Sequence, residues 1–159
     1  MGTTTPLEVR LNARLHAVQR GDRYEDPLAY WLEQRFPGSR VTAAGTLVSP
    51  LGEPLSCAVR AEVTAEPAEV LDAVVAFLED LGTPKGSVAL ADEYEREFGN
   101  NEGLGLYLDG TGTIQGFWES DDTTGVYVYG RSAEMMTSAV DELLTVHPLA
   151  RGHRLERIA

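Results

Sequence analysis

The stretch SCAVRAEVTAEPAEVLDAVVAFLEDLGTPKGSVALA, residues 56–91, decides the fold class. It predicts a strand over Ser56–Val63, a helix over Pro67–Leu81 and a second strand over Ser87–Ala91. The helix has clear ends, because proline stands at its first position and a glycine and a proline follow its last turn. The chain therefore encodes at least one strand–helix–strand unit.

A second unit of the same kind is predicted over residues 124–158. It comprises a strand over Val126–Tyr129, a helix over Ala133–Val146 and a closing strand over Arg154–Ile158. Helices that recur between hairpin-forming strands predict an α+β fold, with a mixed or antiparallel sheet and the helices packed on one face. The repeated βαβ pattern is typical of ferredoxin-like units, and a duplication is one interpretation of it. A length of 159 residues suits one domain.

The N-terminal stretch Leu7–Val18 fits both a helix and a strand. Apolar residues alternate with polar ones from Leu7 to Ala17, which favours a strand. A turn is predicted at residues 21–23, and Asp26-Pro27 predicts the start of a helix that ends at Phe36. Further strands are predicted over Val41–Val48, Leu104–Asp109, Thr113–Glu119 and Gly125–Gly130.

The formal net charge of −12 is concentrated in the middle of the chain. Residues 62–122 hold fifteen acidic and two basic side chains, a local charge of −13, whereas residues 1–61 sum to +1 and residues 123–159 to zero. Such a region repels phosphate backbones and anionic lipids, so we expect neither nucleic acid nor membrane as a partner. Acidity that serves only solubility is the other interpretation.

Cys57 is the only cysteine, which excludes an internal disulfide and a cysteine-rich zinc site. The first residues show no basic segment followed by an apolar core, so they do not read as a secretory signal. Both observations favour a cytoplasmic protein.

No residue pattern points to catalysis, a metal or a cofactor. Ser132 lies between a strand and a helix, where a nucleophilic serine would sit, but the second glycine of that motif is replaced by Glu134. Ser132 is better explained as a helix cap. The three histidines, His16, His147 and His153, are too scattered for a zinc motif.

Five stretches of the chain carry a resemblance: residues 24–28 (YEDPL), 43–46 (AAGT), 81–87 (LGTPKGS), 101–110 (NEGLGLYLDG) and 127–130 (YVYG). Together they resemble a group of small uncharacterised acidic bacterial proteins. Size, acidity and fold class also resemble, more loosely, the immunity proteins that accompany bacterial polymorphic toxins.

The candidate partner-binding surface combines carboxylates for electrostatic steering with aromatics for anchoring. Its residues are Asp92, Glu93, Tyr94, Glu95, Glu97, Phe98, Trp118, Asp121 and Asp122. The leading hypothesis is a non-enzymatic immunity-type inhibitor that occludes a basic toxin or nuclease. The same stretch also fits a solvated acidic loop whose aromatics cover the sheet.

The alternative function is a small-molecule binding module or minor enzyme, with a pocket between the two repeat halves. That pocket would be lined by Tyr107, Trp118, Tyr127, Tyr129 and Arg60. The sequence leaves the oligomeric state open, and a homodimer in which the final strand pairs across subunits is one interpretation.

Overall fold

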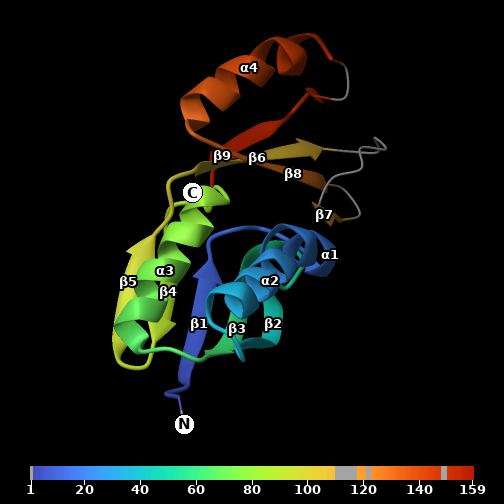
Figure 1. The fold of residues 1–159 in the computed structure, drawn as a ribbon. Coiled ribbons are helices and arrows are strands. Elements are labelled where there is room, and N and C mark those ends of the chain that lie inside the picture. Colours follow the sequence, from blue (N-terminus) through green and yellow to red (C-terminus); the bar gives the residue numbers. More distant parts are fainter. Residues whose placement is uncertain (1, 110–117, 121–122, 148–149) are drawn as a thin grey trace.

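The computed structural model describes residues 2–109, 118–120, 123–147 and 150–159. Its strands form two antiparallel sheets, one of five strands and one of four, stacked end to end along the molecule (Figure 1). The α+β class is confirmed, but two sheets replace the one that the sequence predicts.

The first sheet is built entirely from residues before Gly99. It has the strand order β2-β3-β1-β4-β5, and every neighbouring pair is antiparallel. Because β1 lies between β3 and β4, the β3-α3-β4 connection is a split βαβ unit. The strands are β1 (Thr5–Leu11), β2 (Arg40–Val48), β3 (Pro54–Val63), β4 (Ser87–Ala91) and β5 (Tyr94–Phe98).

Two helices, α2 (Asp26–Arg35) and α3 (Pro67–Asp80), cover one face of this sheet (Figure 1). Alternate residues of β1, β3 and β4 point into the core beneath them, so Val9, Val59 and Ala89 are fully buried. The opposite face carries no helix, and we call it the open face. The predicted packing of helices on one face therefore holds for this sheet.

The N-terminal strand is shorter than the alternation predicts. β1 ends at Leu11, and the predicted turn at residues 21–23 lies inside a continuous helical segment made of α1 (Ala17–Arg20), the π-helical turn η1 (Gly21–Glu25) and α2. Ala13 and Leu15 are still buried, so the alternation correctly reports burial but not strand hydrogen bonding.

The second sheet has the order β7-β8-β6-β9, with α4 (Ala133–Val146) on one face. Its strands are β6 (Glu102–Asp109), β7 (Trp118–Glu119), β8 (Thr123–Gly130) and β9 (Arg154–Arg157). Leu108, Leu144 and Ala150 form the small core beneath α4. A duplicated ferredoxin-like unit is not confirmed, because the second βαβ unit belongs to this separate sheet.

The chain passes from the first sheet to the second through residues 99–101. The Asn101 side chain donates to the Gly82 carbonyl oxygen at 2.9 Å, and the Lys85 N–H donates to the Asn101 carbonyl oxygen at 2.7 Å. Gly99 has φ +111°, and a Cβ built there would lie 2.0 Å from the Pro84 carbonyl oxygen. The link is therefore tied to the loop between α3 and β4.

Candidate functional site

The predicted acidic segment forms the turn between β4 and β5 and the edge strand β5 itself. Asp92, Glu93, Tyr94, Glu95 and Glu97 are all exposed there, and we call these five residues the acidic edge. None of its four carboxylates has an ion-pair partner within the described part of the chain. A tight turn and the strand that follows it, not a loose loop, therefore present the uncompensated negative charge.

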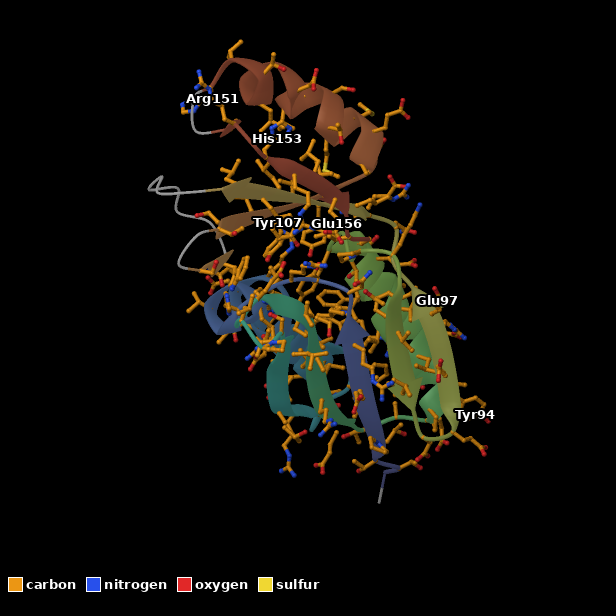
Figure 2. The ribbon with its side chains drawn as sticks, turned by 180° about the vertical axis from the view of Figure 1, so that it is seen from behind. Tyr94, Glu97, Tyr107, Arg151, His153 and Glu156 are labelled. Carbon is orange, nitrogen blue, oxygen red and sulfur yellow. The ribbon has the colours of Figure 1, made fainter. Side chains whose placement is uncertain are left out.

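The side chains of the acidic edge point in two directions, as the strand pairing shows. Glu95 and Glu97 lie opposite Leu90 and Val88, so they flank the open face. Tyr94, 49% exposed, points to the side of α3. Figure 2 shows Tyr94 and Glu97 on the outer margin of the sheet.

The neighbouring helix α3 adds to this charge. Residues 66–98 together carry nine acidic and two basic side chains, a local charge of −7. One of the two basic residues, Arg96, is bound to Asp72 of α3. The other, Lys85, lies 3.3 Å from Glu102 in the second sheet. The acidic character thus extends from β5 over the exposed side of α3.

Four predicted site residues do not join the acidic edge. Phe98 is only 6% exposed and belongs to the core of the first sheet. Trp118 is 8% exposed in the second sheet, where its indole N–H donates to the Leu51 carbonyl oxygen at 3.3 Å. Neither ring offers a surface to a partner. Asp121 and Asp122 lie outside the described residues.

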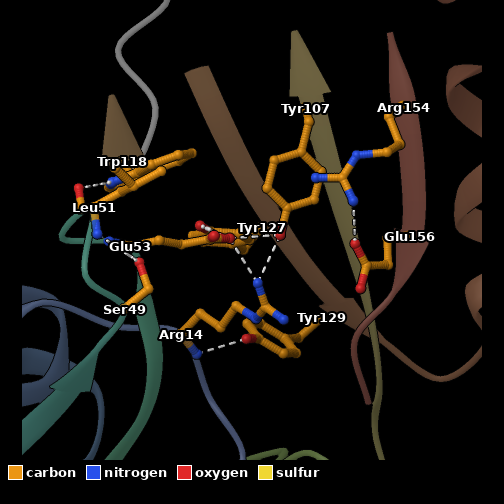
Figure 3. A network of polar contacts seen from close by, with 10 residues as sticks. All are labelled: Arg14, Ser49, Leu51, Glu53, Tyr107, Trp118, Tyr127, Tyr129, Arg154 and Glu156. Carbon is orange, nitrogen blue, oxygen red and sulfur yellow. Dashed lines mark hydrogen bonds and ion pairs between the residues drawn. The ribbon is translucent and has the colours of Figure 1, made fainter. Parts of the chain in front are cut away.

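A second cluster joins the two sheets. The Glu53 carboxylate oxygen Oε1 accepts from Tyr107 Oη at 2.5 Å, from Tyr127 Oη at 2.8 Å and from Arg14 Nη1 at 2.7 Å (Figure 3). The Arg14 N–H donates to Tyr129 Oη at 2.7 Å. Arg14 and Glu53 come from loops of the first sheet and the tyrosines from strands of the second, so we call these five residues the tyrosine junction.

Glycines make room for the tyrosine rings. Tyr107 lies opposite Gly125 in the β6–β8 pairing, Tyr127 opposite Gly105 and Tyr129 opposite Gly103. A Cβ built on Gly103 would lie 2.7 Å from the Tyr129 ring, so any larger residue would displace it. The rings can therefore lie across the sheet and reach the first sheet with their hydroxyl groups.

The junction holds its phenols in the neutral form. Burial, followed by the hydrogen bond to Glu53, raises the pKa of Tyr107 to about 12. The same two causes raise the pKa of Tyr127 well above its ordinary value, and burial raises the pKa of Tyr129 to about 12. Neutral phenols donate hydrogen bonds to the carboxylate, and a cationic Arg14 balances its charge.

The aromatic residues of the predicted pocket do meet, but they fill the space between the sheets. Tyr107 and Tyr127 are each 4% exposed, and Trp118 packs with them. Arg60 lies elsewhere, on the open face, with an ion pair to Glu8 at 2.7 Å. Three shallow depressions of about 470, 340 and 220 Å³ lie along the open face, and none is lined by these aromatics.

Comparison with known proteins gives no relative from which a function could be taken. No family model matches the chain, and neither does any curated protein or solved structure. The function must therefore be inferred from the chain itself.

The structure describes several of the other residues that the sequence offers for chemistry. They contain no group of three or more His, Cys, Asp and Glu side chains placed to hold a metal ion. Ser132 Oγ accepts from the Met135 N–H at 3.3 Å, which is the helix-cap contact that the sequence predicts. Cys57 is buried, and burial raises the pKa of its thiol to about 12.

Among the described helices, none has the length and apolar character needed to cross a membrane.

Arg14 and Glu53 are the site residues that sequence reasoning missed. Their spacing of 39 residues gives no local signal, and the alternation places Arg14 on a strand. The alternating glycines and aromatics of residues 103–107 and 125–129 are a usable signal for the other half of the junction. They indicate rings that lie over glycine backbone.

Proposed function

We propose that this chain is a non-enzymatic binding protein that docks a basic protein partner on its acidic edge. The observation that carries the proposal is the set of four exposed carboxylates, Asp92, Glu93, Glu95 and Glu97, which have no ion-pair partner within the described residues. An immunity-type inhibitor that occludes a basic toxin or nuclease in the cytoplasm fits this surface best.

Electrostatics favours a basic partner over other ligands. Like charges on neighbouring residues repel, and Lys or Arg side chains of a partner would relieve that repulsion while steering the encounter. The half-exposed ring of Tyr94 offers one aromatic anchor beside the charges. Because the strand is fixed by its pairing with β4, the carboxylates are pre-organised and binding orders little new chain.

The test uses each basic protein encoded next to this gene, purified and titrated against the whole chain by calorimetry at low and high salt. We expect one of them to bind, with an affinity that falls as salt rises, and to lose its toxic or nuclease activity in the complex. No binding by any of them, or binding that leaves that activity unchanged, would refute the inhibitor.

Charge reversal locates the surface. Glu93→Lys, Glu95→Lys and Glu97→Lys together should weaken binding by about a hundredfold, since each reversal puts a cation against a basic partner. The matched control reverses three exposed acids elsewhere, with the same change in net charge: Glu33→Lys, Glu134→Lys and Asp141→Lys. Equal losses in both triple variants would mean that overall charge, and not the acidic edge, determines binding.

A further inference from the structure

The edge strands of the two sheets differ in how they are protected against pairing with a further strand. Exposed edges pair with other strands unless charge, shortness or irregularity prevents it. β5 is guarded by Glu95, Arg96 and Glu97. In β9, three of the four residues are charged. These two edges are therefore protected against strand addition, and β7, the other edge of the second sheet, has only two residues.

β2 is the exception. It is nine residues long and stands at the end of the five-stranded sheet opposite β5. After Arg40, its residues 41–48 (VTAAGTLV) contain no charge, and six of these eight are exposed. Bulges interrupt its pairing near each end, but residues 43–47 pair with β3 in an unbroken register, so the middle of the edge is regular.

Apolar side chains are exposed in the last residues of β2 and in the loop after it. Leu47 is 63% exposed, Val48 47% and Leu51, in the hairpin that follows, 74%. Space is open on the sheet face to which Gly45 points, since a Cβ built there would meet no atom within 4 Å. An uncharged edge with adjacent exposed apolar residues favours burial against another strand.

We propose that β2 is a self-association edge, on which a second copy of this chain adds its own β2 antiparallel about a two-fold axis close to Gly45. The five-stranded sheets of the two copies then become one continuous ten-stranded sheet. In this arrangement Leu47 and Val48 of each copy are covered by the first half of the other copy's β2. The contact is the same on both copies, as a two-fold dimer requires.

Charge distribution favours a second copy at this edge. Near β2 the charges cancel in ion pairs: Arg40 with Glu62 at 2.7 Å and Arg14 with Glu53 at 2.7 Å. The acidic edge lies four strands away, roughly 19 Å at a strand spacing of about 4.8 Å. Across the dimer the two acidic edges would be about 43 Å apart, far beyond the screening length of about 8 Å at physiological salt. A chain of net charge −12 can therefore pair with itself here without bringing its acidic regions together.

The first experiment measures the mass of the full chain by sedimentation velocity over a range of concentrations. A pairing of about five residues per copy is a small interface, so we expect a reversible monomer–dimer equilibrium that shifts with concentration. Hydrogen exchange at high and low concentration should show slower exchange for residues 43–47 in the dimer. A monomer at every concentration, or protection that appears at β9 and not at β2, would overturn the proposal.

The second experiment uses matched lysine variants. Ala44→Lys places two like charges beside the axis and should raise the dimer dissociation constant by about tenfold or more. Ala139→Lys, at an exposed position of α4, changes the net charge equally and should leave the constant within about twofold. A dimer that tolerates Ala44→Lys as well as Ala139→Lys would refute pairing through β2. The proposal does not depend on the partner of the acidic edge.

Discussion

Truncating Glu53 should uncouple the two sheets. The Glu53→Ala variant removes one carboxylate oxygen that accepts from two tyrosine hydroxyls of the second sheet and from Arg14 of the first. The side chains of Arg14 and Glu53 are only 16% and 17% exposed, so water replaces the lost contacts poorly. We therefore expect a large loss of stability from this one substitution.

The magnitude follows from the contacts. A hydrogen bond to a charged group contributes about 1.5–3 kcal/mol, but the three bonds share one oxygen and do not add fully. Removing one partner of a buried ion pair costs about 3–5 kcal/mol, and here Arg14 keeps a contact of 2.6 Å with Tyr107 Oη. We expect the free energy of unfolding to fall by about 3 kcal/mol, which corresponds to about 6–12 °C in Tm.

The chain carries a natural probe in each sheet. Its two tryptophans are Trp31, which stacks on Phe77 beside the first sheet, and Trp118 in the second sheet. Urea unfolding followed by fluorescence in Trp31→Phe and Trp118→Phe backgrounds therefore reports each sheet separately. We expect coincident transitions with Glu53 present, as for a single domain, and an earlier Trp118 transition in Glu53→Ala.

The control is Glu33→Ala, an exposed glutamate on α2, which should change the free energy of unfolding by less than about 0.5 kcal/mol. If Glu53→Ala costs no more than Glu33→Ala, the tyrosine junction does not hold the sheets together. Transitions that already differ with Glu53 present would contradict the single domain that the sequence predicts.

Three further substitutions or conditions test other parts of the structure. The pKa of Tyr107 and Tyr129 is about 12 when folded, against 10.0 ordinarily. Their contribution to stability should thus be complete below pH 10 and lost as the pH rises to 12, which urea titrations across that interval would detect. Asp92 is a non-glycine residue with φ 53°, so Asp92→Gly should raise the free energy of unfolding by about 0.5 kcal/mol in urea titrations, and a decrease would contradict strain there. Gly99→Ala should cost at least about 3 kcal/mol by calorimetry, because its Cβ would overlap the Pro84 carbonyl group, whereas an unchanged Tm would mean that the link moves freely.

Elements with local end signals could be predicted closely from the sequence. The predicted helix Pro67–Leu81 differs from α3 by one residue, and the predicted bounds of β4 and α4 agree with the structure. Proline in the first turn of a helix and glycine after its last turn act on neighbouring residues only, so their effect does not depend on tertiary contacts. The exposed carboxylates of residues 92–97 were likewise readable from sequence.

Features that depend on distant partners could not be predicted. β1 stops at Leu11 because the next residues turn to other partners: Asn12 Nδ2 donates to the Lys85 carbonyl oxygen at 2.8 Å, and the Arg14 N–H to Tyr129 Oη. Burial of Phe98 depends on which face of β5 meets α3, which no local pattern fixes. The division into two sheets could not be predicted either, since it depends on which distant strands pair.

The order of the sheets along the chain affects biosynthesis. Every strand of the first sheet lies before Gly99, and the chain crosses to the second sheet through residues 99–101. During translation the first sheet can fold while the second is still being made. Arg14 and Glu53, which form an ion pair in the complete protein, both lie in this first part and are made before the tyrosines that bind them. We therefore expect the half-made protein to carry charged side chains, and not an apolar surface, at the place where the tyrosines will dock.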